Sequence, residues 1–230
     1  MTTSGSVDFS TSRDNIIKDA LLELKALRTG ESPTTDETTD CARALNMMVK
    51  HWQIYTNLWP TKDVQHTLTA GTESYTVGLT LNVNTARPLK LLSCRREDSS
   101  GNEVEIDVVS REEYKRLPTK STQAPASMVY YDPQLANGVL YVWPTGTSGN
   151  VLLNLTFQRP LEDFDATGDT PDFPQEWYLA LVKNLAVILY PQYKSSIDFA
   201  ILKSEAANLL SELRGWDQEQ VSVFFGPEHD

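Results

Sequence analysis

The sequence contains few cysteines and no long apolar run. Its two cysteines, Cys41 and Cys94, are too few for a disulfide framework. We expect both thiols to be reduced and buried, in a protein made in the cytosol. No stretch is long and apolar enough to span a bilayer, and the polar segment Met1–Ser12 lacks the apolar core of a secretory signal peptide. We therefore expect no membrane association.

Basic residues are fewer than acidic residues. The 230 residues include 20 Lys and Arg against 31 Asp and Glu, which gives a formal net charge of -11. Such a surface repels a phosphate backbone, so tight sequence-independent binding of DNA is not expected. The chain is long enough to bury a substantial core in one large domain or two small ones.

Motifs of catalysis and of metal binding are lacking. His51, His66 and His229 do not stand at metal-ligand spacing to one another or to a cysteine. There is no glycine-rich phosphate loop and no Gly-x-Ser-x-Gly nucleophile elbow. We therefore predict that the chain is not an enzyme and has no catalytic, cofactor-binding or metal-binding residues.

The acidic loop 162–172 leaves one alternative open. Asp163, Asp165, Thr167 and Gly168 resemble the start of a calcium loop, in which oxygen ligands alternate before a glycine. The twelfth position of such a loop should be a glutamate, but here it is Pro174. A solvated acidic connection is the main interpretation, and calcium binding is the alternative.

Hydrophobic periodicity predicts helices at both ends of the chain. Ser12 and Thr34 are suitable N-caps, and Thr34 with Glu37 has capping-box spacing. A third helix should start at Pro174 and stop at Tyr190-Pro191, and Ser195 should cap a fourth. The predicted helices are 13–28, 35–58, 174–190 and 195–216, the last with a seven-residue apolar seam of Phe199, Leu202, Ala206, Leu209, Leu213 and Trp216.

The middle of the chain changes to a period of two, which is typical of strands. A hairpin is predicted over 64–77, turning at Ala70-Gly71-Thr72. Ser110 and Glu113 again have capping-box spacing, and Pro118 stops the short helical turn that they begin. Further strands are predicted over 89–95, 104–109, 128–131, 139–143 and 151–158.

These elements predict an α+β fold. Two N-terminal and two C-terminal helices form a four-helix bundle framework, and an antiparallel β domain is inserted between them. The predicted parts are an N-terminal helical pair (1–62), the β domain (63–162), a C-terminal helical pair (163–216) and a tail (217–230).

Three groups of residues are candidates for binding. In the tail, Val221, Val223, Phe224 and Phe225 form a short apolar strand pattern that is too short to fold alone. We predict that it docks on a partner, although folding back on its own β domain is nearly as probable. Basic residues of the β region either form ordinary charged faces or bind an acidic partner: Lys90, Arg95, Arg96, Arg111, Lys115, Arg116 and Lys120. Aromatic residues there either pack across strands or stack on sugars: Tyr130, Tyr131, Tyr141 and Trp143.

Several segments, in this order, are similar to those of a known family. The strongest is Pro171-Asp-Phe-Pro-Gln-Glu-Trp177 leading into an apolar helix with Pro191-Gln-Tyr193. Upstream of it lie Leu68-Thr-Ala-Gly-Thr-Glu-Ser-Tyr-Thr-Val77, Ser110-Arg-Glu-Glu-Tyr114 and Leu140-Tyr-Val-Trp-Pro144. Together they resemble the head-to-tail adaptors of short-tailed bacteriophages (podoviruses), including the tail tubular protein A type.

The resemblance implies a structural virion protein, found at the head-tail junction and assembled in the host cytoplasm. Such adaptors form a ring, usually a dodecamer, beneath the portal protein, help to retain packaged DNA, and provide the platform for later tail proteins. DNA passes through their lumen without specific binding, and they need no cofactor. The helical part would form the ring wall, and the β part would project toward the tail.

Three other functions stay open beside the adaptor. The chain could be another virion ring protein, such as a tail-tube or head-completion protein. It could be a virion-carried hydrolase of cell-wall glycans, or a glycan-binding β domain on a helical stalk. Clearing of a peptidoglycan suspension would reveal the hydrolase, and a glycan array would reveal the binding domain.

Overall fold

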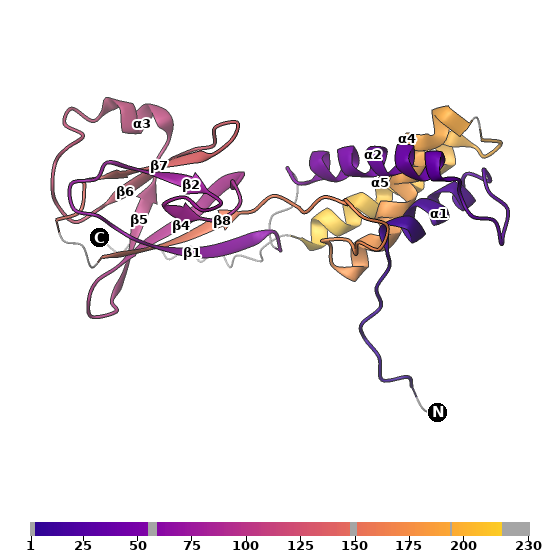
Figure 1. The fold of residues 1–230 in the computed structure, drawn as a ribbon, viewed down its shortest axis with the longest axis horizontal. Coiled ribbons are helices and arrows are strands. Elements are labelled where there is room, and N and C mark those ends of the chain that lie inside the picture. The colour runs from indigo at the N-terminus through magenta and orange to yellow at the C-terminus, as the bar shows by residue number, and fades with distance from the viewer. Residues whose placement is uncertain (1–2, 55–58, 148–150, 194, 218–230) are drawn as a thin grey trace, which may run out of the picture. The chain divides into compact units, whose positions relative to one another are not determined.

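The structure is a computed structural model that describes residues 3–54, 59–147, 151–193 and 195–217. The chain forms two compact units (Figure 1). The helical unit comprises the chain up to Leu58 and again from Leu161 on, and the β unit comprises Trp59–Pro160. The β unit is therefore one continuous piece of chain, whereas the helical unit is built from two separate pieces.

In the described part of the helical unit there are four helices of two turns or more, with α4 at their centre. Helix α4 contacts α1, α2 and α5, and α1 also contacts α2. The bounds are α1 Arg13–Glu23, α2 Thr35–Trp52, α4 Tyr178–Tyr193 and α5 Phe199–Trp216, with a 3-10 turn at Gln175–Trp177 before α4. None of the helices in the described ranges is long and apolar enough to cross a membrane.

The predicted α+β class is confirmed, but a regular four-helix framework is not. Helix α5 packs mainly on α4, and of its apolar seam only Leu202 and Ala206 are buried. Phe199 and Trp216, at the two ends of the seam, are exposed. Helix α5 is therefore attached to one neighbour rather than enclosed by three.

Helix starts follow their capping residues. Ser12 caps α1 by accepting the amide of Asn15. At α2 the predicted capping box forms, because Thr34 Oγ1 accepts the Glu37 amide at 3.3 Å and Glu37 Oε2 accepts the Thr34 amide at 2.8 Å. The predicted Ser195 cap is wrong, since Asp198 caps α5 by accepting the amide of Ala200. Ser195 Oγ instead donates to the carbonyl of Leu24 at 2.7 Å.

Three helix ends differ from the predictions. Helix α1 ends at Glu23 instead of Arg28, because Lys25 adopts φ 55°, through which an α-helix cannot continue. Helix α2 ends at Trp52, and the predicted end at Leu58 lies outside the described residues. Helix α4 does not stop at Pro191 but includes it. The missing amide costs one hydrogen bond in the last turn, which the packing of α4 outweighs.

The β unit is a single eight-stranded sheet that nearly closes on itself. The strand order is β1-β8-β4-β5-β6-β7-β2-β3, and the two outer strands, β1 and β3, also contact each other. The short helix α3 (Arg111–Arg116) begins at the predicted capping box of Ser110 and Glu113. The strands are β1 Thr61–Thr67, β2 Ser74–Gly78, β3 Val83–Asn84, β4 Lys90–Glu97, β5 Glu103–Val108, β6 Met128–Asp132, β7 Gly138–Trp143 and β8 Leu152–Gln158.

Two predictions about strand pairing are wrong. The sheet is not purely antiparallel, because β5 pairs with β6, and β2 with β3, in parallel. The predicted hairpin over 64–77 does not form either. Its turn exists, with the Thr72 amide donating to the Thr69 carbonyl, but β1 pairs with β8 and β2 pairs with β7. Near closure of the sheet instead gives β1 and β2 partners that are distant in sequence.

The ends of the β unit lie side by side. Strand β1 pairs with β8 from Thr61↔Gln158 to Thr67↔Leu152, and the Arg159 amide donates to the Pro60 carbonyl at 2.7 Å. The chain therefore enters and leaves the unit at one place. Its apolar core is filled by side chains that alternate along the strands, among them Val77, Leu140, Val142, Leu153, Leu155 and Phe157, all fully buried.

Candidate functional site

His66, Cys41 and Cys94 are packed among other side chains of the fold. His66 is half-buried, and its ring meets Tyr75 edge-on with centroids 4.4 Å apart; burial lowers the pKa of this imidazole. Cys41 and Cys94 are free and buried, and burial raises the pKa of the Cys94 thiol to about 12. Among the residues that the structure describes, no group of three His, Cys, Asp or Glu could hold a metal ion. His229 lies outside them.

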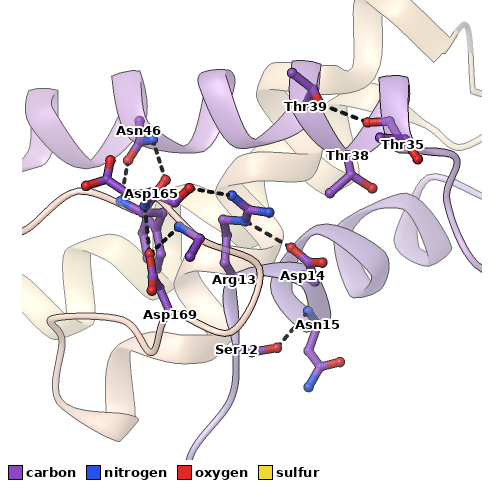
Figure 2. Close-up of polar contacts among 12 residues, drawn as sticks. Ser12, Arg13, Asp14, Asn15, Thr35, Thr38, Thr39, Asn46, Asp165 and Asp169 are labelled. Carbon is purple, nitrogen blue, oxygen red and sulfur yellow. Dashed lines mark hydrogen bonds and ion pairs between the residues drawn. The ribbon is translucent and has the colours of Figure 1, made fainter.

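The acidic loop 162–172 uses its carboxylates to fix its own backbone (Figure 2). Asp169 Oδ2 accepts the amides of Asp165 and Ala166, at 2.7 and 2.6 Å. Asp172 Oδ2 accepts the Glu162 amide at 3.1 Å, and Asp163 pairs with Lys50 of α2 at 2.8 Å. The carboxylates of Asp163, Asp169 and Asp172 are thus directed at protein donors.

Two helices hold this loop in place. Asn46 of α2 donates to the Phe164 carbonyl at 3.1 Å and accepts the Phe164 amide at 2.9 Å. Arg13 at the start of α1 donates its amide to the Asp169 carbonyl at 2.8 Å, and its buried guanidinium reaches the Asp165 carbonyl at 3.4 Å (Figure 2). The loop is therefore part of the helical unit, and no sequence signal had indicated Arg13 or Asn46 as its anchors.

A large groove lies beside α1 and α4. It has a volume of about 930 Å³. Its walls combine apolar and charged side chains from the N-terminal segment, α1, α4 and the turn before α5: Phe9, Leu22, Tyr178, Leu179, Val182 and Ile197 are apolar or aromatic, and Asp19, Glu23, Lys25 and Asp198 are charged. We call this surface the α1–α4 groove. The sequence-based interpretation had not included it.

Charges beside the α1–α4 groove differ in how they are compensated. Lys183 of α4 donates to Glu23 at 2.9 Å and to Glu205 of α5 at 3.2 Å. Burial alone would lower the pKa of Lys183, but these two carboxylates raise it above its ordinary value. Asp19 has no such partner, and desolvation together with the charge of Glu23 raises its pKa despite the nearby Lys18. Asp19 is therefore a carboxylate of the groove that forms no ion pair within the described residues.

A second, smaller groove separates the start of α4 from the end of α5. Its volume is about 320 Å³, and Leu179, Leu209, Leu213 and Trp216 line it between Glu176 and Glu212. Leu179 is 54% exposed and belongs to both grooves. The two grooves therefore form one continuous apolar surface across α4. This surface extends to Trp216, the last residue of the predicted apolar seam of α5.

The predicted docking residues Val221, Val223, Phe224 and Phe225 lie outside the described residues. What the structure describes is the end of α5 that precedes them. Trp216 is 64% exposed there, and the Asp217 amide closes the helix by donating to the Leu213 carbonyl at 2.9 Å.

The aromatic residues of the β unit divide into two groups. Tyr130 and Tyr141 stack with centroids 5.7 Å apart, and both rings pack on Tyr114 of α3. Tyr131 instead points into the core against Phe157. Trp143 donates its indole N–H to the Thr119 carbonyl at 2.8 Å. The four aromatics considered as a sugar platform do not share one face, and Tyr114, which completes the stacked group, was not predicted.

Several basic residues of the β unit are engaged within it. Arg96 donates to the Ala126 carbonyl at 3.1 Å, and Lys120 donates to the carbonyls of Tyr114 and Leu117. Arg95 pairs with Glu103 at 3.5 Å, and Arg116 with Glu112 at 2.5 Å. These contacts favour ordinary charged faces over a dedicated site for an acidic partner.

Comparison with known proteins relates the chain to one family. A family model described as "SU10 adaptor protein" matches residues 13–226. No curated protein matches the chain. Among solved structures, the chain is similar to one described as the neck of an empty GTA particle computed with C6 symmetry, at 14% sequence identity and a TM-score of 0.27, over 83% of this chain and 85% of that chain. At that TM-score, nothing about the assembly of this chain follows from the likeness.

Proposed function

Because the chain belongs to the SU10 adaptor protein family, we propose that it is a structural virion protein, the head-to-tail adaptor of a short-tailed phage of the tail tubular protein A type. The observation that carries this proposal is the extent of the family match. Residues 13–226 include the whole β unit and both pieces of the helical unit. The relationship therefore concerns the complete arrangement and not one borrowed domain.

In this role the protein forms a ring, a dodecamer, beneath the portal protein of the filled head. The helical unit forms the ring wall, and the β unit projects toward the later tail proteins. The ring helps to retain packaged DNA and supports the tail. It is assembled in the host cytoplasm, needs no cofactor and catalyses no reaction.

Two physical features support this role. The continuous apolar surface across α4, rimmed by carboxylates, suits burial against another protein, because large exposed apolar patches mark interaction sites. The net charge of -11 suits a channel through which DNA passes without specific binding, because like charges do not hold the phosphate backbone.

The tail 217–230 supplies a further contact in the proposal. Val221, Val223, Phe224 and Phe225 add to the edge of a portal subunit or a neighbouring adaptor. Main-chain hydrogen bonds would give affinity in such a strand addition, and the alternating side chains would give specificity.

The decisive experiment mixes the purified chain with the portal protein of its own virus and images the mixture by electron microscopy. We expect mainly monomers of the chain alone in light scattering, and a ring seated on the portal after mixing. Rings without portal would contradict the dependence on a partner but not the function. Absence of any complex, together with clearing of a peptidoglycan suspension, would favour the hydrolase instead.

A further inference from the structure

Helix α2 carries a ridge of exposed side chains on the face turned away from the helical unit. Arg43, Met47 and His51 follow one another at spacings of four within α2, which aligns them on one side, and Ile54 follows two residues after the end of the helix. Met47 is 62% exposed and Ile54 61%, and the Arg43 side chain is 71% exposed. The opposite face, with Leu45, Met48, Val49 and Trp52, is buried. We call the exposed row the α2 ridge.

The α2 ridge is basic as well as apolar. The first turn of α2 is acidic, with Asp36 and Glu37, whereas Lys50 and His51 stand in its last turn. Lys50 is engaged with Asp163 and the Leu161 carbonyl. Arg43 has one partner, the exposed Asp40 at 2.8 Å. An exposed ion pair of this kind contributes little to the stability of the fold, so Arg43 can readily exchange Asp40 for another carboxylate.

The α1–α4 groove has the complementary character. Its walls offer Leu22, Leu179 and Val182 to apolar side chains, and Asp19 offers a carboxylate that forms no ion pair within the described residues, although Lys18 is nearby. Glu23 and Asp198 also line the groove, but Lys183 engages the first and the second caps α5. Lys25 is the cation at the rim. A ligand that fills the groove should therefore bring aliphatic side chains and at least one positive charge.

From these two surfaces we infer that the α2 ridge of one copy of the chain packs into the α1–α4 groove of the next. Met47 and Ile54 would fill the apolar walls, and Arg43 would exchange Asp40 for Asp19. The inference rests on the ring proposed above and specifies which faces of neighbouring subunits meet in it.

The chain's own ends are less suitable occupants of the groove. Residues 3–12 carry Asp8 and no basic side chain, and the tail 218–230 carries Glu219, Glu228 and Asp230 with no Lys or Arg. Both would add negative charge beside Asp19 and Glu23, which disfavours them. The α2 ridge combines the required charge with the required apolar side chains.

The geometry also fits closure into a ring. No α2 residue lines the groove, so the two surfaces come from different elements of one helical unit. An interface between two different faces is heterologous, and repetition of such an interface generates rings or open filaments, whereas a self-complementary face stops at a dimer. The portal would then select the closed form.

Crosslinking of the full-length chain tests the inference. Met47→Cys is introduced into one batch and Leu179→Cys into a second batch with a mass tag, and the two are mixed with a short bis-maleimide. Both positions are more than half exposed, and the native cysteines are buried. We expect a mixed dimer at a yield well above that of either batch alone. Leu135→Cys in the β unit, 98% exposed, replaces Leu179→Cys in the control mixture.

Reversal of two charges tests the proposed ion pair between Arg43 and Asp19. Arg43→Glu in the first batch should lower the mixed-dimer yield by roughly twofold to fivefold, the effect of one exposed ion pair. Asp19→Lys in the second batch should do the same, and the two together should restore the yield. Circular dichroism melting of each variant confirms that it is folded.

Three results would overturn the inference: a mixed yield no higher than that of the Leu135→Cys control, equal crosslinking within the Met47→Cys batch alone, or no rescue by the double charge exchange. Imaging with portal is independent of all three. Rings on portal in which the same two cysteines do not crosslink would reject this interface and leave the adaptor function standing. If the crosslink forms but no rings appear on portal, the interface stands and the adaptor function is rejected.

Discussion

The ring of Tyr131 on β6 lies against Gly138 on β7. A Cβ atom at position 138 would overlap the Tyr131 ring, and the Tyr131 hydroxyl donates to the Pro88 carbonyl at 2.8 Å. Because glycine has no side chain, position 138 leaves space for the Tyr131 ring, which packs in the core of the β unit.

Gly138→Ala should destabilise the β unit, because the new methyl group forces Tyr131 out of its position. Overpacking of this kind costs typically about 1–3 kcal/mol. Urea unfolding followed by fluorescence measures it. Gly168→Ala is the matched control, since a Cβ there meets no atom within 4 Å. Equal effects of the two substitutions would show that Tyr131 adjusts freely.

Tyr131 should also make the β unit sensitive to alkali. Burial raises the pKa of Tyr131 to about 12, whereas an unfolded tyrosine titrates near ~10. The folded state therefore disfavours the phenolate, so this contribution to stability is complete below pH ~10 and declines between pH ~10 and the folded pKa. The absorbance titration of the parent minus that of Tyr131→Phe should show one phenol with a midpoint near 12. A midpoint near that of an unfolded tyrosine would contradict the buried position.

Trp177→Ala should destabilise the helical unit strongly. Trp177 is 1% exposed, and its ring packs against Trp52 and Phe173 at centroid distances of 6.0 and 5.8 Å. Truncation of a buried tryptophan typically costs about 3–5 kcal/mol. Thermal melting should therefore fall sharply, while Trp216→Ala, at a position 64% exposed, should change it little. An unchanged melting temperature for Trp177→Ala would place this side chain outside the core.

Removal of residues 221–230 separates docking on a partner from folding back on the same chain. If Val221, Val223, Phe224 and Phe225 dock on a partner, the shortened chain melts like the parent but no longer binds portal. Serine at these four positions is the matched variant, because it keeps the length and the charge of the tail. Lower melting with intact portal binding would assign the tail to the fold of its own subunit.

Predictions from the sequence were correct for local features, which depend only on neighbouring residues. Both capping boxes, Thr34 with Glu37 and Ser110 with Glu113, form as their spacing predicts. The strands β4 to β8 also lie close to their predicted ranges. A side-chain cap and an alternating strand each depend on residues only a few positions apart. A local sequence pattern is therefore sufficient to predict them.

Predictions failed where distant segments decide the outcome. The turn at 70–72 suggested a hairpin, but closure of the sheet gives β1 and β2 the partners β8 and β7. The apolar seam of α5 suggested burial on several helices, yet α5 has α4 as its main neighbour. The α1–α4 groove could not be predicted at all, because it combines α1, α4 and the turn at 196–198, which only the tertiary structure brings together.

The division of the chain into units fixes the order in which they can be completed on the ribosome. The β unit is the continuous segment 59–160, so all its strands have been synthesised before the first residue of α4. Helices α1 and α2 must wait, because α4, which both of them contact, and Phe173 and Trp177, which pack against Trp52, come from beyond Leu161. During translation, the chain therefore carries an unfinished helical half with exposed apolar side chains while the sheet is already complete. A chain truncated after residue 160 and released from the ribosome should bind chaperones through its first two helices and not through its strands.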